Sequence, residues 1–214
     1  IGYLMPIMFF KAVDNNSNDA ILEKGSNGQF FFQLSSRNQI KNTHLYASLF
    51  IDEVRLSGLF NKIQRRNQLG YTVGGSLTDV FGISYLTIGG EYTRVNPFVY
   101  RNFLPAQNYT HQGYLLGDWL GSNADRIVLF SRFTPLPRLK LNARYTHLRK
   151  GGAGTIDQQY VQQPQPPFLF DFQQRSDEFM FNASYEYIHR LYLNMQVRRF
   201  DQRNVFSVGL TYGL

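Results

Sequence analysis

The segment from Asn96 to Asn123 is rich in side chains that suit sugar binding, and it contains the single Trp of the chain. Aromatic rings stack on the faces of sugar rings, while amide and carboxylate groups hydrogen-bond to hydroxyls. The alternative is that these side chains only pack an ordered loop. We predict glycan contacts, and the candidate contact residues are Tyr100, Asn108, Tyr109, His111, Tyr114, Asp118 and Trp119.

Residues for catalysis or metal binding are poorly arranged in this sequence. The four His residues fall on separate elements, without the spacing of metal ligands. No serine occupies a strand-to-helix elbow, and no glycine-rich loop is placed to cradle a phosphate. The absence of Cys excludes disulfides and thiolate chemistry. We therefore predict a protein without catalytic residues, metal sites or cofactors.

Alternation with a period of two residues is the dominant pattern along the chain. Between Leu139 and Thr146, for example, apolar residues alternate with Lys, Asn, Arg and Thr. Such alternation places successive side chains on opposite faces of a β-strand. About ten strands are predicted, near 2–12, 27–36, 42–53, 69–79, 84–95, 124–134, 138–149, 177–188, 191–200 and 203–214. Their length of roughly 9–12 residues spans a bilayer at a tilt of about 45°, whereas soluble strands have about five or six.

The connections between these strands alternate between short and long. The short ones lie near 37–41, 80–83, 135–137 and 189–190, and the long ones near 13–26, 54–68, 96–123 and 150–176. Outer-membrane barrels have short periplasmic turns and long external loops. The last connection, near 201–203, should be external yet is short. The pattern predicts an all-β fold, an antiparallel transmembrane β-barrel.

In such a barrel the apolar rows face lipid and the polar rows face an aqueous interior. The polar rows then give the interior a basic lining, in which cations outnumber anions. One interpretation is a cross-strand lattice of salt bridges that stiffens or plugs the barrel. The other is a surface or conduit that attracts acidic sugars. The charges concerned are Asp52, Glu91, Arg126, Arg132, Lys140, Arg144, Glu186 and Arg198.

Composition agrees with a strand-rich membrane protein. The 214 residues include 16% aromatics and 17% charged residues, with a net charge of +7. No apolar run approaches the roughly 18 residues of a spanning helix. The basic residues are scattered, without the tail or helix that would indicate a nucleic-acid partner. We expect a bacterial outer-membrane location, with outer-membrane lipid or lipopolysaccharide, acidic surface polysaccharide and other outer-membrane proteins as partners.

Several stretches resemble the Wzi-type capsule-assembly barrels, including Bacteroidota relatives associated with gliding motility. The resemblance lies in Met5–Phe10, Leu49–Glu53, Glu91–Tyr100, Asn108–His111 and Leu115–Asn123. It implies a barrel of about 16–18 strands that binds or organises capsular or surface polysaccharide and is not an enzyme. The sequence begins with Ile1, and no signal-peptide pattern follows it, so we expect residues 1–214 to form one barrel segment, the C-terminal half of a longer chain.

Three functions are compatible with the sequence. The first is a glycan-binding assembly protein, which predicts basic, aromatic loops and a largely plugged interior. The second is a porin-like channel for small or anionic solutes, which predicts ion conductance. The third is a structural subunit of a secretion or motility complex, which predicts stable protein partners. The loop composition and the resemblance favour the first.

Overall fold

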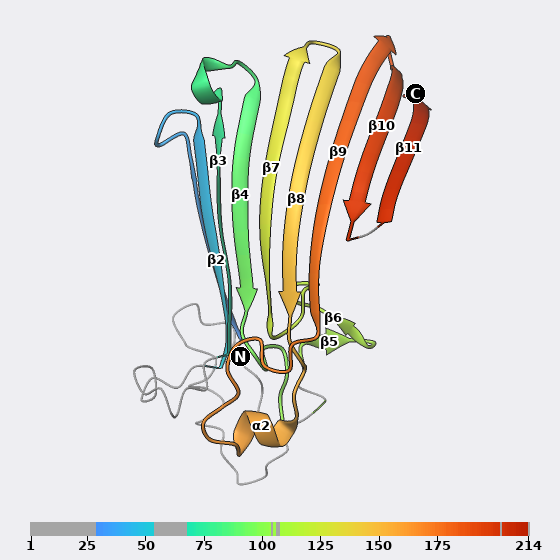
Figure 1. Cartoon of the computed structure of the whole chain (residues 1–214). Helices are drawn as coiled ribbons and strands as arrows, with labels where there is room; N and C mark the ends of the chain where they lie inside the picture. Colours follow the sequence, from blue (N-terminus) through green and yellow to red (C-terminus); the bar gives the residue numbers. More distant parts are fainter. Residues whose placement is uncertain (1–28, 54–67, 104, 106–107, 202, 214) are drawn as a thin grey trace.

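A computed structural model describes residues 29–53, 68–103, 105, 108–201 and 203–213, and its main feature is one curved antiparallel sheet (Figure 1). The sheet has nine strands, and every strand pairs with its neighbours in chain order. The all-β prediction is therefore confirmed. The strands are β1 (Phe30–Arg37), β2 (Thr43–Glu53), β3 (Gln68–Thr78), β4 (Leu86–Val95), β7 (Ala124–Leu136), β8 (Leu139–Lys150), β9 (Gln174–Ile188), β10 (Leu191–Phe200) and β11 (Arg203–Tyr212).

Nine of the predicted strands are present, and the tenth, near 2–12, lies outside the described residues. Strands β7 and β9 are longer than the alternation indicated. Smaller elements lie in the connections: a 3-10 turn η3 (Val80–Gly82), a hairpin of β5 (Thr110–His111) and β6 (Tyr114–Leu115), and a short helix α2 (Ile156–Tyr160). Within the described residues, no helix is long and apolar enough to cross a membrane.

Short turns gather at one end of the sheet and long connections at the other, as predicted (Figure 1). The connections near 13–26 and 54–67 lie outside the described residues. The short β10–β11 turn is the exception, and Figure 1 shows it well above the lower end of β9. There the backbone N–H of Asp201 donates to the carbonyl of Asp177 at 3.1 Å.

The sheet is open within the described part of the chain, with β1 at one edge and β11 at the other. A closed barrel of about 16–18 strands therefore stays a prediction. The register nevertheless fixes which side chains share a face. One face carries the apolar rows and is called the outer face below. The opposite, inner face carries the predicted lining charges, and the long loop between β4 and β7 packs against it.

The apolar residues of the outer face form a band that runs obliquely across the strands. On β2 the band covers Leu45 to Ile51, and on β10 it covers Leu191 to Val197. Following the strand pairs from Leu45 across the sheet leads to Arg199, which is already beyond the band on β10. The band on β10 is therefore displaced completely past the band on β2.

The displacement gives the tilt of the strands relative to the band. The centre of the apolar band on β10 is displaced from the centre of the band on β2 by about eight residues, or about 26 Å along the strands. The strand spacings from β2 to β10 span roughly 29 Å across the sheet. The resulting angle of about 40° is the tilt at which strands cross the membrane in barrels.

Candidate functional site

The long loop between β4 and β7 folds back onto the inner face, where it forms the main buried cluster of the described residues. Asp52, at the end of β2, anchors it: its carboxylate accepts from the backbone N–H of Tyr100 at 2.8 Å and from the Gln29 amide at 2.8 Å. Asp52 is buried. The predicted lining charge thus lies on the inner face but serves to hold the loop.

Tyr100 is the centre of the buried cluster. Its ring stacks on Tyr109 with centroids 5.8 Å apart and contacts Phe50 at 5.2 Å. Its hydroxyl accepts from the backbone N–H of Asp118 at 3.1 Å, and burial raises its pKa. A side chain at Gly117 would collide with this ring, because a Cβ there would lie 2.3 Å from it. Tyr100 is therefore placed to support the loop and not to stack on a sugar.

Asn108 and Asp118 also form contacts within the loop. The Asn108 side-chain oxygen accepts from the backbone N–H of Asn102 at 2.8 Å. The Asp118 carboxylate accepts from the N–H of Leu120 at 2.9 Å and lies 3.8 Å from the Arg126 guanidinium. Both side chains are partly exposed. They retain some capacity for a ligand, but they also hold the loop's shape.

The remaining aromatic and imidazole candidates are presented to solvent. His111 and Tyr114 are paired across the β5–β6 hairpin, and Tyr114 is 78% exposed. Trp119 is 68% exposed, and its ring lies 5.2 Å from the guanidinium carbon of Arg126. The predicted set therefore divides into a loop core around Tyr100 and Tyr109 and an exposed group of His111, Tyr114 and Trp119.

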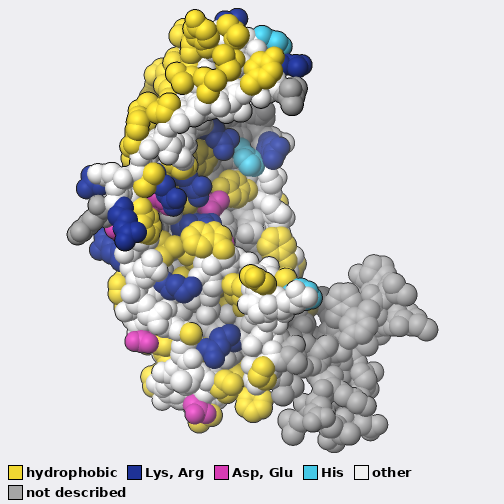
Figure 2. Space-filling model, turned by 90° about the vertical axis from the view of Figure 1, so that its right-hand side faces the viewer, with side chains coloured by type: hydrophobic (Ala, Val, Ile, Leu, Met, Phe, Trp, Pro, Cys, Tyr) yellow, Lys and Arg dark blue, Asp and Glu magenta, His cyan; other side chains and the backbone are white. Residues whose placement is uncertain are grey.

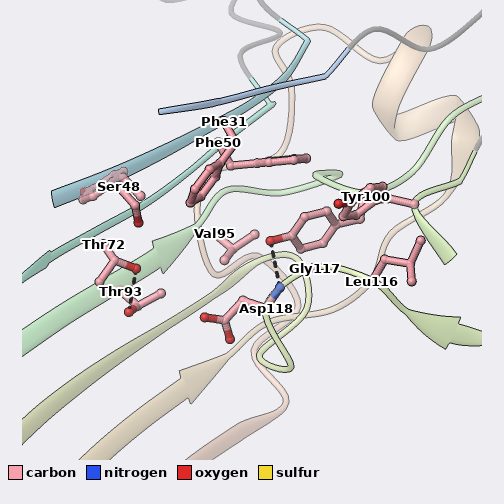
Figure 3. A pocket seen from close by; sticks show the side chains of 13 residues that line it. Phe31, Ser48, Phe50, Thr72, Thr93, Val95, Tyr100, Leu116, Gly117 and Asp118 are labelled. Atoms are coloured by element: carbon pink, nitrogen blue, oxygen red, sulfur yellow. Dashed lines mark hydrogen bonds between the residues drawn. The ribbon is translucent and has the colours of Figure 1, made fainter. Parts of the chain in front are cut away.

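A pocket of about 310 Å³ lies between the loop and the inner face of β1 to β4 (Figure 3). Phe31, Phe50 and Tyr109 supply aromatic surface to its lining. Ser48 and the Thr72–Thr93 pair, whose hydroxyl oxygens are 3.0 Å apart, supply hydrogen-bonding groups. Figure 3 shows Asp118 and the Tyr100 hydroxyl on the loop side. Aromatic surface beside hydroxyls is suited to a sugar ring.

Asn123 joins the two long connections, a role that sequence reasoning missed. The residue is fully buried, and its amide nitrogen donates to the carbonyls of Gly152 at 2.9 Å and Phe170 at 3.1 Å. Its side-chain oxygen accepts from the N–H of Leu169 at 2.7 Å. Two features of the sequence could have indicated this role: an Asn, which tolerates a positive φ, directly before a strand, and the Gly151–Gly152 pair that faces it. These features alone do not identify Asn123 as the residue that joins the two loops, called the loop hub below.

Some lining charges form ion pairs or hydrogen bonds with other protein groups. Arg126 pairs with Glu91 at 3.0 Å, and the Tyr46 hydroxyl donates to Glu91 at 2.7 Å. Arg198 pairs with Glu178, and Glu186 accepts from the backbone N–H of Arg190 at 3.0 Å. Counting Asp52, five of the eight predicted charges are therefore bonded to other protein groups. Of these, Glu91, Arg126 and Arg198 are in ion pairs, whereas Asp52 and Glu186 accept from neutral N–H groups, so a lattice that plugs the barrel stays a prediction.

The other three lining charges, Arg132, Lys140 and Arg144, form no ion pair with a carboxylate among the residues that the structure describes. Arg132 lies 5.6 Å from the centroid of the Phe130 ring. The strand pairs place two of these cations beside amide and hydroxyl side chains: Asn142, Asn182, Gln196 and Ser207 in the row of Arg132, and Ser184 and Asn194 in that of Lys140. Arg144 lies between Phe130 and Met180. Figure 2 shows dark blue Lys and Arg side chains in and around the hollow of the molecule.

Comparison with known proteins adds little to this geometry. No protein-family model matches the sequence, and no curated protein matches it. One solved structure that is similar in outline is described as a KdgM porin, with a TM-score of 0.34 and 9% sequence identity. The similarity covers 87% of this chain and 91% of that one. A similarity at this level indicates no function for this chain.

Proposed function

We propose that this chain forms part of the wall of an outer-membrane β-barrel that binds acidic surface polysaccharide. The observation that carries the proposal is the cation group of the inner face, Arg132, Lys140 and Arg144, which has no carboxylate partner in the described residues. Amides and hydroxyls share the rows of Arg132 and Lys140. Guanidinium groups bind carboxylates through paired hydrogen bonds, and amides bind sugar hydroxyls. The combination fits a polymer of acidic sugars.

The outer face supports the membrane part of the proposal. Its apolar band is continuous over the strands, and its oblique course matches the strand tilt of a barrel. Large exposed apolar surfaces require another apolar phase to cover them. The polar inner face would be costly in a dry core and is satisfied by water in a lumen.

The long loops provide the second part of a glycan surface. With short turns toward the periplasm, the loop end faces the cell exterior. Trp119 and Tyr114 are exposed there, and the pocket beside Tyr109 opens on the same loop. A polymer chain would then contact aromatic side chains at the loops and cations on the inner face.

Replacement of two inner-face cations tests the proposal. We expect Arg132→Gln with Arg144→Gln to weaken binding of a uronic-acid polysaccharide about tenfold or more, because each charge-assisted hydrogen bond contributes about 1.5–3 kcal/mol. The measurement is affinity electrophoresis of the refolded protein in detergent, with a neutral polysaccharide of similar length in parallel. The matched control is Lys41→Gln with Arg190→Gln, which removes two cations from short turns and leaves the three inner-face cations in place.

Binding that falls for the acidic polymer in the inner-face variant alone supports the proposal. Equal retention of acidic and neutral polymers, or an equal loss in both double variants, contradicts it. The binding should also weaken steeply with added salt, because exposed charges are screened over about 8–10 Å at moderate ionic strength.

A porin-like channel is the second candidate, favoured by the polar lining of the inner face beside β9 to β11. A shallow pocket there is lined by Asn182, Asn194, Gln196 and Thr211 among others. A channel predicts stepwise, anion-selective conductance in planar bilayers. A plugged glycan-binding barrel predicts none, since the loop between β4 and β7 is packed onto the inner face.

A further inference from the structure

A row of arginines crosses the outer face at its loop end. The strand pairs place Arg94 opposite Asp125, Asp125 opposite Arg149, and Arg149 opposite Arg175. Neighbouring strands are about 4.8 Å apart, so these side chains are within reach of one another. The row therefore places cations on β4, β8 and β9 and one carboxylate on β7.

The single carboxylate in the row is neutralised within it. Asp125 is buried and accepts from Arg149 twice, at 2.9 Å and 2.5 Å. Arg94 donates to Asn96 at 3.0 Å and lies over the Phe168 ring at 3.7 Å, contacts that orient the guanidinium without cancelling its charge. Arg175 forms no ion pair among the described residues. A net positive charge thus remains along the row.

The next positions on the outer face carry further polar groups. Asp177 accepts from the Tyr145 hydroxyl at 2.5 Å and bonds to His147 at 2.8 Å, and Arg175 lies near enough to affect the Asp177 carboxylate. The Asp201 carboxylate accepts from the backbone N–H of Asp177 at 3.2 Å. Hydrogen bonds hold both acids but leave their charges in place, so Asp177 and Asp201 offset part of the positive charge of the row. Arg199 adds one more cation on β10.

These arginines follow the border of the oblique apolar band. The row lies beyond the loop end of the band on β4 to β9, with His147 and Asp177 between the band and the arginines of β8 and β9. Arg199 marks the border on β10, where the band is displaced along the strands. In Figure 2 hydrophobic side chains cover the upper left of the molecule and dark blue side chains begin below them. An apolar surface edged by cations is complementary to a lipid that has acyl chains and an anionic headgroup.

We propose that Arg94, Arg149, Arg175 and Arg199 form a binding surface for the phosphate headgroups of lipids in the leaflet that borders the long loops. The inference rests on the proposed function for the embedding of the barrel. Arginine forks bind phosphate oxygens through paired hydrogen bonds. The acyl chains of the same lipid cover the adjacent apolar band, so headgroup and tail are recognised together.

Native mass spectrometry of the detergent-purified protein tests this surface. The probes are diphosphorylated lipid A, its dephosphorylated form, and inorganic phosphate without a lipid. The test variant is Arg175→Gln with Arg199→Gln, because neither side chain pairs with a carboxylate among the described residues and the Asp125–Arg149 pair is left intact. The control is again Lys41→Gln with Arg190→Gln, two cations in turns at the opposite end.

The surface predicts that the unmodified protein prefers the diphosphorylated lipid and that the test variant loses this preference about tenfold, since two cations are removed from an anionic interface. The control variant should retain it. Equal binding of both lipids by the unmodified protein, an equal loss in both variants, or binding of inorganic phosphate as tight as that of the lipid contradicts the inference. Failure to retain any lipid contradicts the proposed function instead, since the apolar band would then not face a membrane.

Discussion

At the residue scale, the molecule divides its polar side chains into those that build the loops and those that remain available. Asp52, Tyr100 and Asn123 are buried and tie the long connections to the sheet. Arg132, Lys140 and Arg144 have no carboxylate partner in the part of the chain that the structure describes. The sequence could not separate these two groups, because the composition of a loop does not show which of its side chains are buried and which are exposed.

Asn123→Ala tests the role of the loop hub. The substitution leaves two carbonyls and one N–H without their partner, and each buried unsatisfied group costs about 1–3 kcal/mol. We expect faster proteolysis within 151–173 and a free energy of unfolding lower by about 2–4 kcal/mol. Limited proteolysis and urea unfolding in detergent check this. Gln112→Ala, at an exposed position in the β5–β6 turn, should change neither quantity. An Asn123→Ala variant whose loops are cleaved at the unmodified rate would contradict the hub role.

At the element scale, the strands were predictable because a period of two is imposed by backbone geometry alone. The register was not, since it depends on which residues oppose one another across strands. Only the register showed that the apolar band is oblique and that Arg94, Arg149 and Arg175 share a row. The predicted lining charges do share the inner face, as alternation indicated, but their division into paired and unpaired sets was visible only in three dimensions.

Adjacent positions on β11 test the assignment of the two faces. Val208 lies on the outer face opposite Met195, whereas Ser207 lies on the inner face opposite Gln196. An arginine at the bilayer midplane costs about 2–4 kcal/mol on a lipid-facing position and little in a lumen. We expect Val208→Arg to lower the stability in lipid vesicles by that amount and Ser207→Arg to leave it nearly unchanged. Equal effects of the two substitutions in a vesicle-based unfolding titration would contradict the assignment.

At the scale of the whole molecule, the sheet has two faces suited to two solvents. The outer face offers a broad apolar band with arginines beyond its loop end, and the inner face offers charges, amides and a packed loop. The tilt of about 40° between strands and band follows from the register and agrees with membrane barrels. Closure of the barrel and the strand number implied by the Wzi-type resemblance stay predictions, because the described sheet is open.

A scan of single cysteines along β10 measures the central claim most directly. The chain contains no Cys, so each introduced thiol from Leu191 to Arg198 can carry one environment-sensitive fluorophore in a protein reconstituted in vesicles. We predict quenching by a lipid-borne quencher at Leu191, Leu193, Met195 and Val197, and quenching by aqueous iodide at Tyr192, Asn194, Gln196 and Arg198. Quenching of both sets by iodide alone would contradict the claim that the apolar side chains face a membrane. Protection of the apolar set from both quenchers would contradict it as well.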